Sequence, residues 1–111
     1  MAGHFEIKRA KDGQYFFKLV AGDTTLMSEM YKQRASAENG IASVKKNSPD
    51  DARYDRRTSN SDQPYFVLKA GNGEVIGTSG MYASDEAMAS GIEALKQSAA
   101  DAEVRDETQG S

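Results

Sequence analysis

Hydrophobic and polar positions alternate along several short segments of the chain. In residues 4–9, Phe5 and Ile7 fall on one side while Glu6 and Lys8 fall on the other. This period of two is typical of a half-buried strand. Further segments with alternation, or with many β-branched and apolar residues, are residues 15–21, 24–31, 52–58, 64–70, 75–82 and 101–108. The pattern therefore predicts seven strands.

The hydrophobic period changes to that of a helix in two places. Ala37, Ile41 and Val44 stand at positions i, i+4 and i+7, which predicts an amphipathic helix over about residues 34–46. The same stripe returns later in the chain at Met88, Ile92, Leu95 and Ala99. We therefore expect two helices, each following a pair of hairpin strands.

The second helix has the stronger start signal. Ser84 is a good N-cap residue, and Asp85 and Glu86 favour the positive end of the helix dipole. Gln33 occupies the corresponding position before the first helix. We expect the first helix start to be weaker by about 1 kcal/mol.

The two parts of the chain match each other at a spacing of 51 positions. The matched pairs include Gly22/Gly73, Ser28/Ser79, Met30/Met81, Tyr31/Tyr82, Gly40/Gly91, Ile41/Ile92 and Lys45/Lys96. A chain of 111 residues has room for one comfortable core rather than two. Two repeats, about residues 3–50 and 51–108, are therefore expected to form a single domain over residues 1–111, with residues 52–58 ending one repeat and beginning the next.

These elements predict an α+β fold. Two tandem β-β-β-α repeats plus a C-terminal strand, related by a pseudo-twofold axis, would form a single sheet with two helices packed on it. Each repeat would supply half of the core, as the two chains do in an isologous dimer. Gly40 and Gly91 fall on the buried stripes although glycine disfavours helix by about 1 kcal/mol. We interpret them as places where one backbone approaches another.

Composition narrows the class of protein. The chain has 17 acidic and 14 basic residues, a net charge of −3, and no cysteine. No basic segment resembles a phosphate-binding footprint, so nucleic acid is an unlikely partner. No apolar run approaches the roughly 20 residues of a membrane helix, and the start of the chain has no apolar stretch typical of a signal peptide. We expect a soluble, cytoplasmic monomer that needs no membrane, metal or cofactor.

Two motifs carry a resemblance to a known family. They are A-x-N-G-x-V-I-x-x-S-x-M-Y at residues 70–82 and G-I-x-S-V-K-x-N at residues 40–47. From Gly3 to Thr108 the chain resembles the bacterial YegP-like proteins. The resemblance implies one sheet whose C-terminal strands are exchanged between the two repeats, and it implies no assigned biochemical function. The chain departs from the family pattern at Gly80, where a glutamate is usual, and at Gln33, where serine or threonine is usual.

The sequence contains no recognisable catalytic constellation. His4 is the single imidazole, and the glycines near the hairpin tips belong to neither a P-loop nor a dinucleotide-binding motif. The nearest polar group of residues is Ser28, Glu29 and Tyr31, for which one hypothesis is a small hydrolase or transferase. Its counterpart in the second repeat retains Ser79 and Tyr82. In the alternative interpretation, each serine bridges backbone groups while each tyrosine packs its ring and leaves its hydroxyl in water.

The face of the predicted sheet away from the helices offers a second candidate site. Phe16, Lys18 and Lys69 fall on this face. They could receive a peptide or an anionic ligand, or bind single-stranded nucleic acid weakly, although lysine also keeps an open sheet soluble. The leading hypothesis is a non-enzymatic module that binds a protein, peptide or small ligand, either on this face or in the groove between the repeats.

Overall fold

The computed structural model describes residues 3–22 and 24–106. These residues form one mixed sheet of seven strands and two α-helices, so the α+β class is confirmed. In chain order the elements are β1 (His4–Arg9), β2 (Tyr15–Ala21), β3 (Thr24–Ser28), α1 (Arg34–Asn47), η1 (Asp51–Arg53), β4 (Tyr54–Thr58), β5 (Pro64–Lys69), β6 (Val75–Ser79), α2 (Asp85–Ser98), η2 (Ala99–Asp101) and β7 (Glu103–Asp106).

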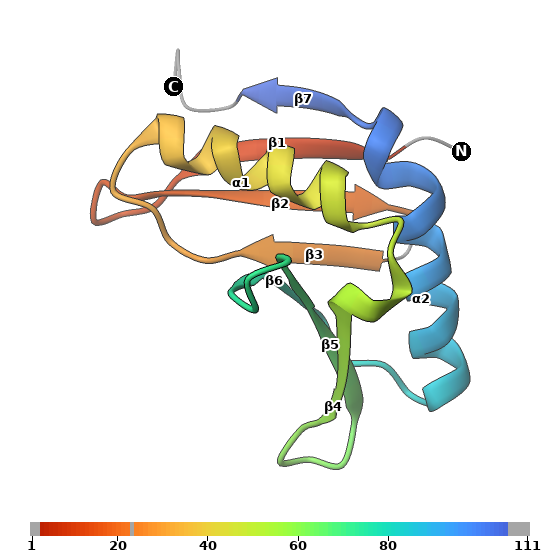
Figure 1. Ribbon diagram of the computed structural model, residues 1–111. Coiled ribbons are helices and arrows are strands. Elements are labelled where there is room, and N and C mark those ends of the chain that lie inside the picture. Colours follow the sequence, from red (N-terminus) through yellow and green to blue (C-terminus); the bar gives the residue numbers. More distant parts are fainter. Residues whose placement is uncertain (1–2, 23, 107–111) are drawn as a thin grey trace.

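The strand order across the sheet is β4-β5-β6-β3-β2-β1-β7. β3 and β6 pair antiparallel at the centre, and β7 lies parallel to β1 at one edge. Figure 1 shows how strongly the sheet twists, because β1–β3 run across the view while β4 and β5 run down it. β4, which follows α1, pairs with β5, and β7, which follows α2, pairs with β1.

Both helices cover the same face of the sheet and share one core with it. The two helix stripes pack over strand residues whose side chains are fully buried. The buried positions of the helices are Ala37, Gly40, Ile41, Val44 and Asn47 in α1, and Met88, Gly91, Ile92, Leu95 and Ser98 in α2. The strand residues in this core include Phe5, Ile7, Phe17, Leu19, Leu26, Phe66 and Leu68. The periodicity of the sequence predicted these stripes correctly, apart from Ala99, which is buried but lies in η2.

The helix starts differ as expected. The Ser84 hydroxyl accepts a hydrogen bond from the Ala87 N–H at 3.1 Å, whereas Gln33 makes no side-chain cap. Both helices contain 14 residues, and their starts (34 and 85) and ends (47 and 98) are separated by the same 51 positions as the sequence matches. Helix residues, and the serines and tyrosines that precede the helices, are called equivalent below when they stand at this spacing. In β2 and β5 the counterparts are 49 positions apart, since Phe17 and Phe66 make the same contacts.

Some predicted strand ends were wrong. β3 ends at Ser28 and β6 at Ser79, whereas the predicted strands ran on to residues 31 and 82. The chain leaves the regular ladder at each serine because the serine hydroxyl takes over a backbone hydrogen bond, as described below. The short turns η1 and η2 precede β4 and β7, so these strands begin later than expected. Residues 107 and 108 of the last predicted strand lie outside the described residues.

Candidate functional site

The hydroxyl groups of Ser28 and Ser79 bridge backbone groups in the same way. Ser28 Oγ accepts from the Phe17 N–H at 2.9 Å and donates to the Glu29 carbonyl at 2.8 Å. Ser79 Oγ accepts from the Phe66 N–H at 3.0 Å and donates to the Gly80 carbonyl at 2.8 Å. Each hydroxyl proton is therefore already committed to a carbonyl oxygen. This geometry favours a structural role over a nucleophilic one.

We predict that Ser79→Ala lowers the free energy of unfolding by about 1–3 kcal/mol, because the Phe66 N–H is buried and would lose its acceptor. Thermal unfolding followed by circular dichroism measures this change. Ser84→Ala is a matched control, since that serine caps an exposed helix end and its loss costs only about 1 kcal/mol. A Ser79→Ala protein as stable as the wild type would contradict the structural role.

Tyr31 and Tyr82 lie between the end of a strand and the next helix. The Tyr31 ring stacks on Phe17 with ring centroids 6.4 Å apart, and the Tyr82 ring stacks on Phe66 at 6.2 Å. Tyr82 donates a hydrogen bond to Thr24 Oγ1 at 3.2 Å, so its hydroxyl is not left to water alone. Partial burial raises the pKa of both phenols, and Glu29 and Glu74 add to the rise for Tyr31.

The same two tyrosines explain the helix glycines. A Cβ atom at Gly91 would lie 2.3 Å from the Tyr82 hydroxyl oxygen, and one at Gly40 would lie 2.7 Å from that of Tyr31. The expectation of backbone packed against backbone was therefore wrong. The glycines leave room for tyrosine side chains, which sequence spacing alone does not reveal.

Each tyrosine marks a groove between one helix and the hairpin of the other half of the sheet. The Tyr82 groove has a volume of about 450 Å³ and is lined by Ala21, Gly22, Thr24, Met81, Tyr82, Ala87, Ser90, Gly91 and Ala94. The Tyr31 groove has a volume of about 240 Å³ and is lined by Tyr31, Ser36, Asn39, Gly40, Ser43, Ala70, Asn72, Glu74, Val75 and Ile76. The four helix residues of one groove are each equivalent to one of the four in the other. Their chemistry differs, because Asn39, Asn72 and Glu74 make the smaller groove more polar.

The open face of the sheet carries the other candidate residues. Phe16, Lys18 and Lys69 are half-buried there, but the Lys69 ammonium lies 3.4 Å from an Asp55 carboxylate oxygen. Strand pairing places one row across all seven strands of this face, namely Arg105, Glu6, Lys18, Met27, Thr78, Val67 and Asp55. The centre of the row is apolar, and Met27 is 43% exposed. Charges of both signs flank it, so this face presents no continuous cationic track.

His4, the single imidazole, lies on the open face at 2.7 Å from Glu6. In the described residues, no group of three or more histidine or carboxylate side chains could hold a metal ion. No helix in this part of the chain is long and apolar enough to cross a membrane.

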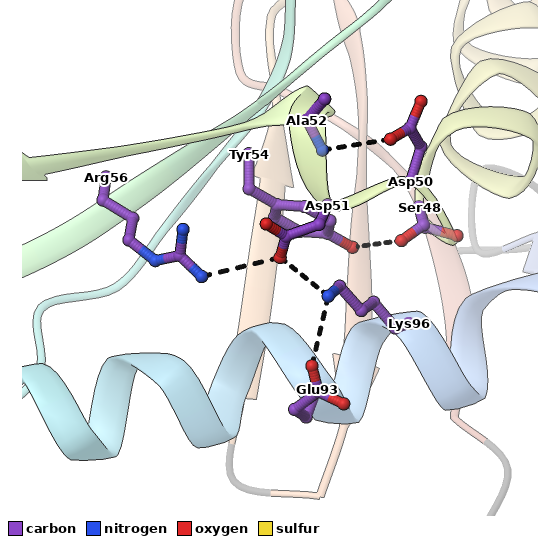
Figure 2. A network of polar contacts seen from close by, with 8 residues as sticks. All are labelled: Ser48, Asp50, Asp51, Ala52, Tyr54, Arg56, Glu93 and Lys96. Atoms are coloured by element: carbon purple, nitrogen blue, oxygen red, sulfur yellow. Dashed lines mark hydrogen bonds and ion pairs between the residues drawn. The ribbon is translucent and has the colours of Figure 1, made fainter.

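A polar network joins the start of β4 to α2 (Figure 2). The Asp51 carboxylate accepts from the Lys96 ammonium at 2.7 Å and lies 3.6 Å from the Arg56 guanidinium, while Lys96 also contacts Glu93 at 3.2 Å. Beneath this network the buried Tyr54 hydroxyl donates to the Ser48 carbonyl at 2.7 Å. The network fixes where the chain passes from α1 into the second half, which is a structural task.

The hydrogen bond from Lys96 lowers the pKa of the Asp51 carboxyl below its ordinary value. Stability from this group is therefore present above the ordinary aspartate pKa of about 4 and is lost as pH falls through the lower pKa of the folded protein. We predict that Asp51→Asn lowers the melting temperature by a few degrees at neutral pH and makes no difference near pH 2. Melting curves across pH 2–7 measure this, with Asp101→Asn, in the short turn η2 that follows α2, as the control. The same difference in melting temperature between Asp51→Asn and the wild type at pH 2 and at pH 7 would contradict the prediction.

The fold and its grooves define a class: a small α+β protein with one sheet, two helices and two related grooves. The family described as "Domain of unknown function (DUF1508)" matches this chain twice, at residues 10–55 and 59–106. The chain belongs to this family, which includes the YegP-like UPF0339 proteins. The double match fits a tandem repeat.

Relatives of known sequence and structure cover nearly the whole chain. UPF0339 protein ACIAD0721 of Acinetobacter baylyi is 56% identical over 97% of this chain and 99% of its own length. UPF0339 protein YegP of Escherichia coli O157:H7 is 44% identical over 97% and 100%. The solution structure of UPF0339 protein SO3888 from Shewanella oneidensis matches with a TM-score of 0.90 at 40% identity, covering 97% of this chain and 93% of that one. The solution structure of yegP from E. coli, a protein of unknown function, matches with a TM-score of 0.89 at 41% identity, covering 100% and 97%.

Proposed function

We propose that this protein is a non-enzymatic binding module that holds a small ligand, or one side chain of a peptide, in the Tyr82 groove. One observation carries the proposal: a groove of about 450 Å³ lies between α2 and the β2–β3 hairpin, within the range of about 300–1,000 Å³ typical of ligand pockets. Small residues such as Ala87 and Gly91 form its wall. Met81, which is 51% exposed, offers an adaptable apolar contact at its rim.

The polar groups of the Tyr82 groove define the class of ligand. Thr24 and Tyr82 hydrogen-bond to each other, and Ser90 is exposed on the helix side. A ligand with an apolar body and one or two hydrogen-bonding groups fits this lining. The Tyr31 groove is about half as large, and Glu74 and two asparagines line it. It is the weaker candidate for an apolar ligand and the better one for a polar or cationic molecule.

The other hypotheses have less support. A hydrolase or transferase centred on Ser28 would need that hydroxyl to leave its carbonyl partner, and a base within reach of it. A single-stranded nucleic acid would need stacking platforms and free cations, but Lys69 contacts Asp55, and Lys18 lies opposite Glu6 in the neighbouring strand. A partner on the open sheet face has Met27 as its apolar anchor and remains the second candidate.

We also propose that residues 3–50 and 51–108 are two repeats of one domain that exchange the strands following their helices. The double family match supports this interpretation, as do the helices of equal length. The pairing of β4 with β5 and of β7 with β1 supports the exchange. Binding in a groove shared by the two halves then depends on their union.

An NMR titration of ¹⁵N-labelled protein with a metabolite panel and short peptides tests the groove. We expect amide shifts at Gly22, Thr24, Ala87 and Gly91. Ser90→Trp should fill the Tyr82 groove and abolish these shifts, whereas Asn39→Trp at the equivalent position of the Tyr31 groove should not. Shifts at Phe16, Lys18 and Lys69 would move the site to the open sheet face. Shifts at Ser28 and Tyr31 would move it to the other groove.

A further inference from the structure

The Tyr31 groove has a polar wall on its helix side. It lies between α1 and the β5–β6 hairpin and has a volume of about 240 Å³. Its helix residues stand at i, i+3, i+4 and i+7, so they share one face of α1; they are Ser36, Asn39, Gly40 and Ser43. On the equivalent face of α2 the only polar side chain is that of Ser90. The α1 wall thus offers one amide and two hydroxyl groups.

A β-bulge shapes the opposite wall. Leu68 pairs with Gly77 and Lys69 with Val75, so Ile76 has no residue opposite it. The pairs of β2 with β3 follow one another without a shift. A bulge takes the side chains near it out of strict alternation between the two faces of a sheet. Three successive residues of the hairpin therefore line the groove, namely Glu74, Val75 and Ile76.

Two polar groups of the groove are available to a ligand. Within the described part of the chain, the Glu74 carboxylate accepts no hydrogen bond and contacts no cation, and the Tyr31 hydroxyl makes no hydrogen bond. The Tyr82 hydroxyl, by contrast, is held by Thr24. Partial burial raises the pKa of Tyr31, and the charges of Glu29 and Glu74 raise it further, so the phenol stays neutral at neutral pH. The groove therefore combines one negative charge with a neutral phenol.

One cation lies near the tip of the hairpin, but it is already engaged. The Arg53 guanidinium lies 3.5 Å from the position that a Cβ atom of Gly71 would take. It also lies 3.7 Å from an Asp50 carboxylate oxygen and donates to the Asn47 amide oxygen at 3.2 Å. Among the described residues that line the groove, Glu74 alone carries a charge. An occupant of the groove therefore meets a negative charge.

We propose that the Tyr31 groove binds a primary alkylammonium group, with its charge at Glu74 and its alkyl chain along the hairpin wall. An ammonium group has three N–H donors and no acceptor. The groove offers acceptors on Glu74, Tyr31 and Asn39, and it offers apolar contact on Ala70, Val75 and Ile76.

The size of the groove limits the ligand further. Its volume lies below the range of about 300–1,000 Å³ that is typical of pockets for drug-sized ligands, so one alkyl chain suits it better than a larger molecule. The alkylammonium group can belong to a free amine or to a lysine side chain of a peptide. This site is separate from the Tyr82 groove and requires no ligand there.

The test is a titration of the ¹⁵N-labelled full chain with n-butylammonium chloride at neutral pH, with sodium chloride at the same ionic strength as the blank. We expect amide shifts at Asn39, Gly40, Glu74 and Val75, with a dissociation constant in the millimolar range. 1-Butanol, which has the same alkyl chain without the charge, should bind roughly tenfold more weakly. The acetylated and amidated peptide Gly-Lys-Gly distinguishes the two sources. Tighter binding of the peptide than of butylammonium assigns the site to a lysine side chain, and weaker binding assigns it to a free amine.

Four variants of the chain locate the site. Glu74→Gln should weaken butylammonium binding roughly tenfold, because it removes the charge inside the groove. Glu29→Gln removes an equal charge outside the lining and should weaken binding only about twofold. Asn39→Trp should fill the groove and abolish the shifts. Ser90→Trp, which fills the Tyr82 groove, should leave them unchanged, so this site and the proposed function can fail separately.

Four results would overturn the proposal. The first is no shift at Asn39, Gly40 and Glu74 with millimolar butylammonium. The second is equally tight binding of 1-butanol, since the charge would then contribute nothing. The third is an equal loss of binding in Glu74→Gln and Glu29→Gln, which would mean that the overall charge of the protein attracts the amine. The fourth is a set of shifts that Ser90→Trp abolishes and Asn39→Trp does not, which would place the amine in the Tyr82 groove.

Discussion

Replacing Gly91 with leucine is expected to lower the melting temperature by roughly 10 °C. A Cβ atom at this position would lie 2.3 Å from the Tyr82 hydroxyl oxygen and 2.9 Å from Thr24 Oγ1. Tyr82 cannot move aside cheaply, because its ring stacks on Phe66 and its hydroxyl bonds to Thr24. The better helix propensity of leucine, worth about 1 kcal/mol, offsets only part of the overpacking.

Differential scanning calorimetry measures the Gly91→Leu effect, and two further variants locate its cause. Gly80→Ala is the control, since a Cβ there would meet nothing within 4 Å. The double variant Gly91→Ala, Tyr82→Phe should be more stable than Gly91→Ala alone, because it removes the closest atom. A Gly91→Leu protein with the same melting temperature as the wild type would show that Tyr82 does not need the space that Gly91 leaves.

Much of the fold follows from local pattern. The stripe of Ala37, Ile41 and Val44 and its later copy placed both helices, because a helix that packs on a sheet must bury one face. The alternation of apolar and polar residues placed the strands, because a strand covered by helices on one side also buries one face. The strand ends at Ser28 and Ser79 did not follow from pattern, because a hydroxyl that replaces a ladder partner has the same sequence signal as any serine in a strand.

Each groove lies between a helix of one half and a hairpin of the other half. The local pattern of residues does not encode how the two halves pack together. The Tyr82 groove joins α2 to the β2–β3 hairpin, more than 50 positions earlier in the chain. Of the residues that line this groove, the repeat in the sequence pointed to Tyr82 as a site residue but not to Thr24, Ala87 or Ser90. A usable signal was present: glycine stands on both buried helix stripes at equivalent positions, and each glycine leaves room for the tyrosine that precedes the same helix, Tyr31 for Gly40 and Tyr82 for Gly91. Gly91 also lies against Thr24 of the other half.

Dividing the chain is expected to abolish folding in both parts. Residues 1–50 contain β1, β2, β3 and α1, but they lack β7, which pairs with β1, and β6, which pairs with β3. Residues 60–111 lack β4, whose Tyr54 packs its ring edge-on against Phe66 with centroids 5.5 Å apart. A sheet of three strands or fewer beside one helix buries too little apolar surface to offset chain entropy.

Each fragment should therefore show narrow proton chemical shifts and no cooperative melt at concentrations where it is monomeric. Mixing residues 1–59 with residues 60–111 is the matched test, because this cut falls in the β4–β5 hairpin and leaves every strand intact. Because the mixture supplies both halves of the core, it should regain dispersed shifts and one cooperative transition, with a melting temperature that rises with concentration. A monomeric fragment that melts cooperatively alone would show that one half can bury enough apolar surface to fold by itself. Folding would then not require the two halves to pack together, and the groove between them would not follow from folding.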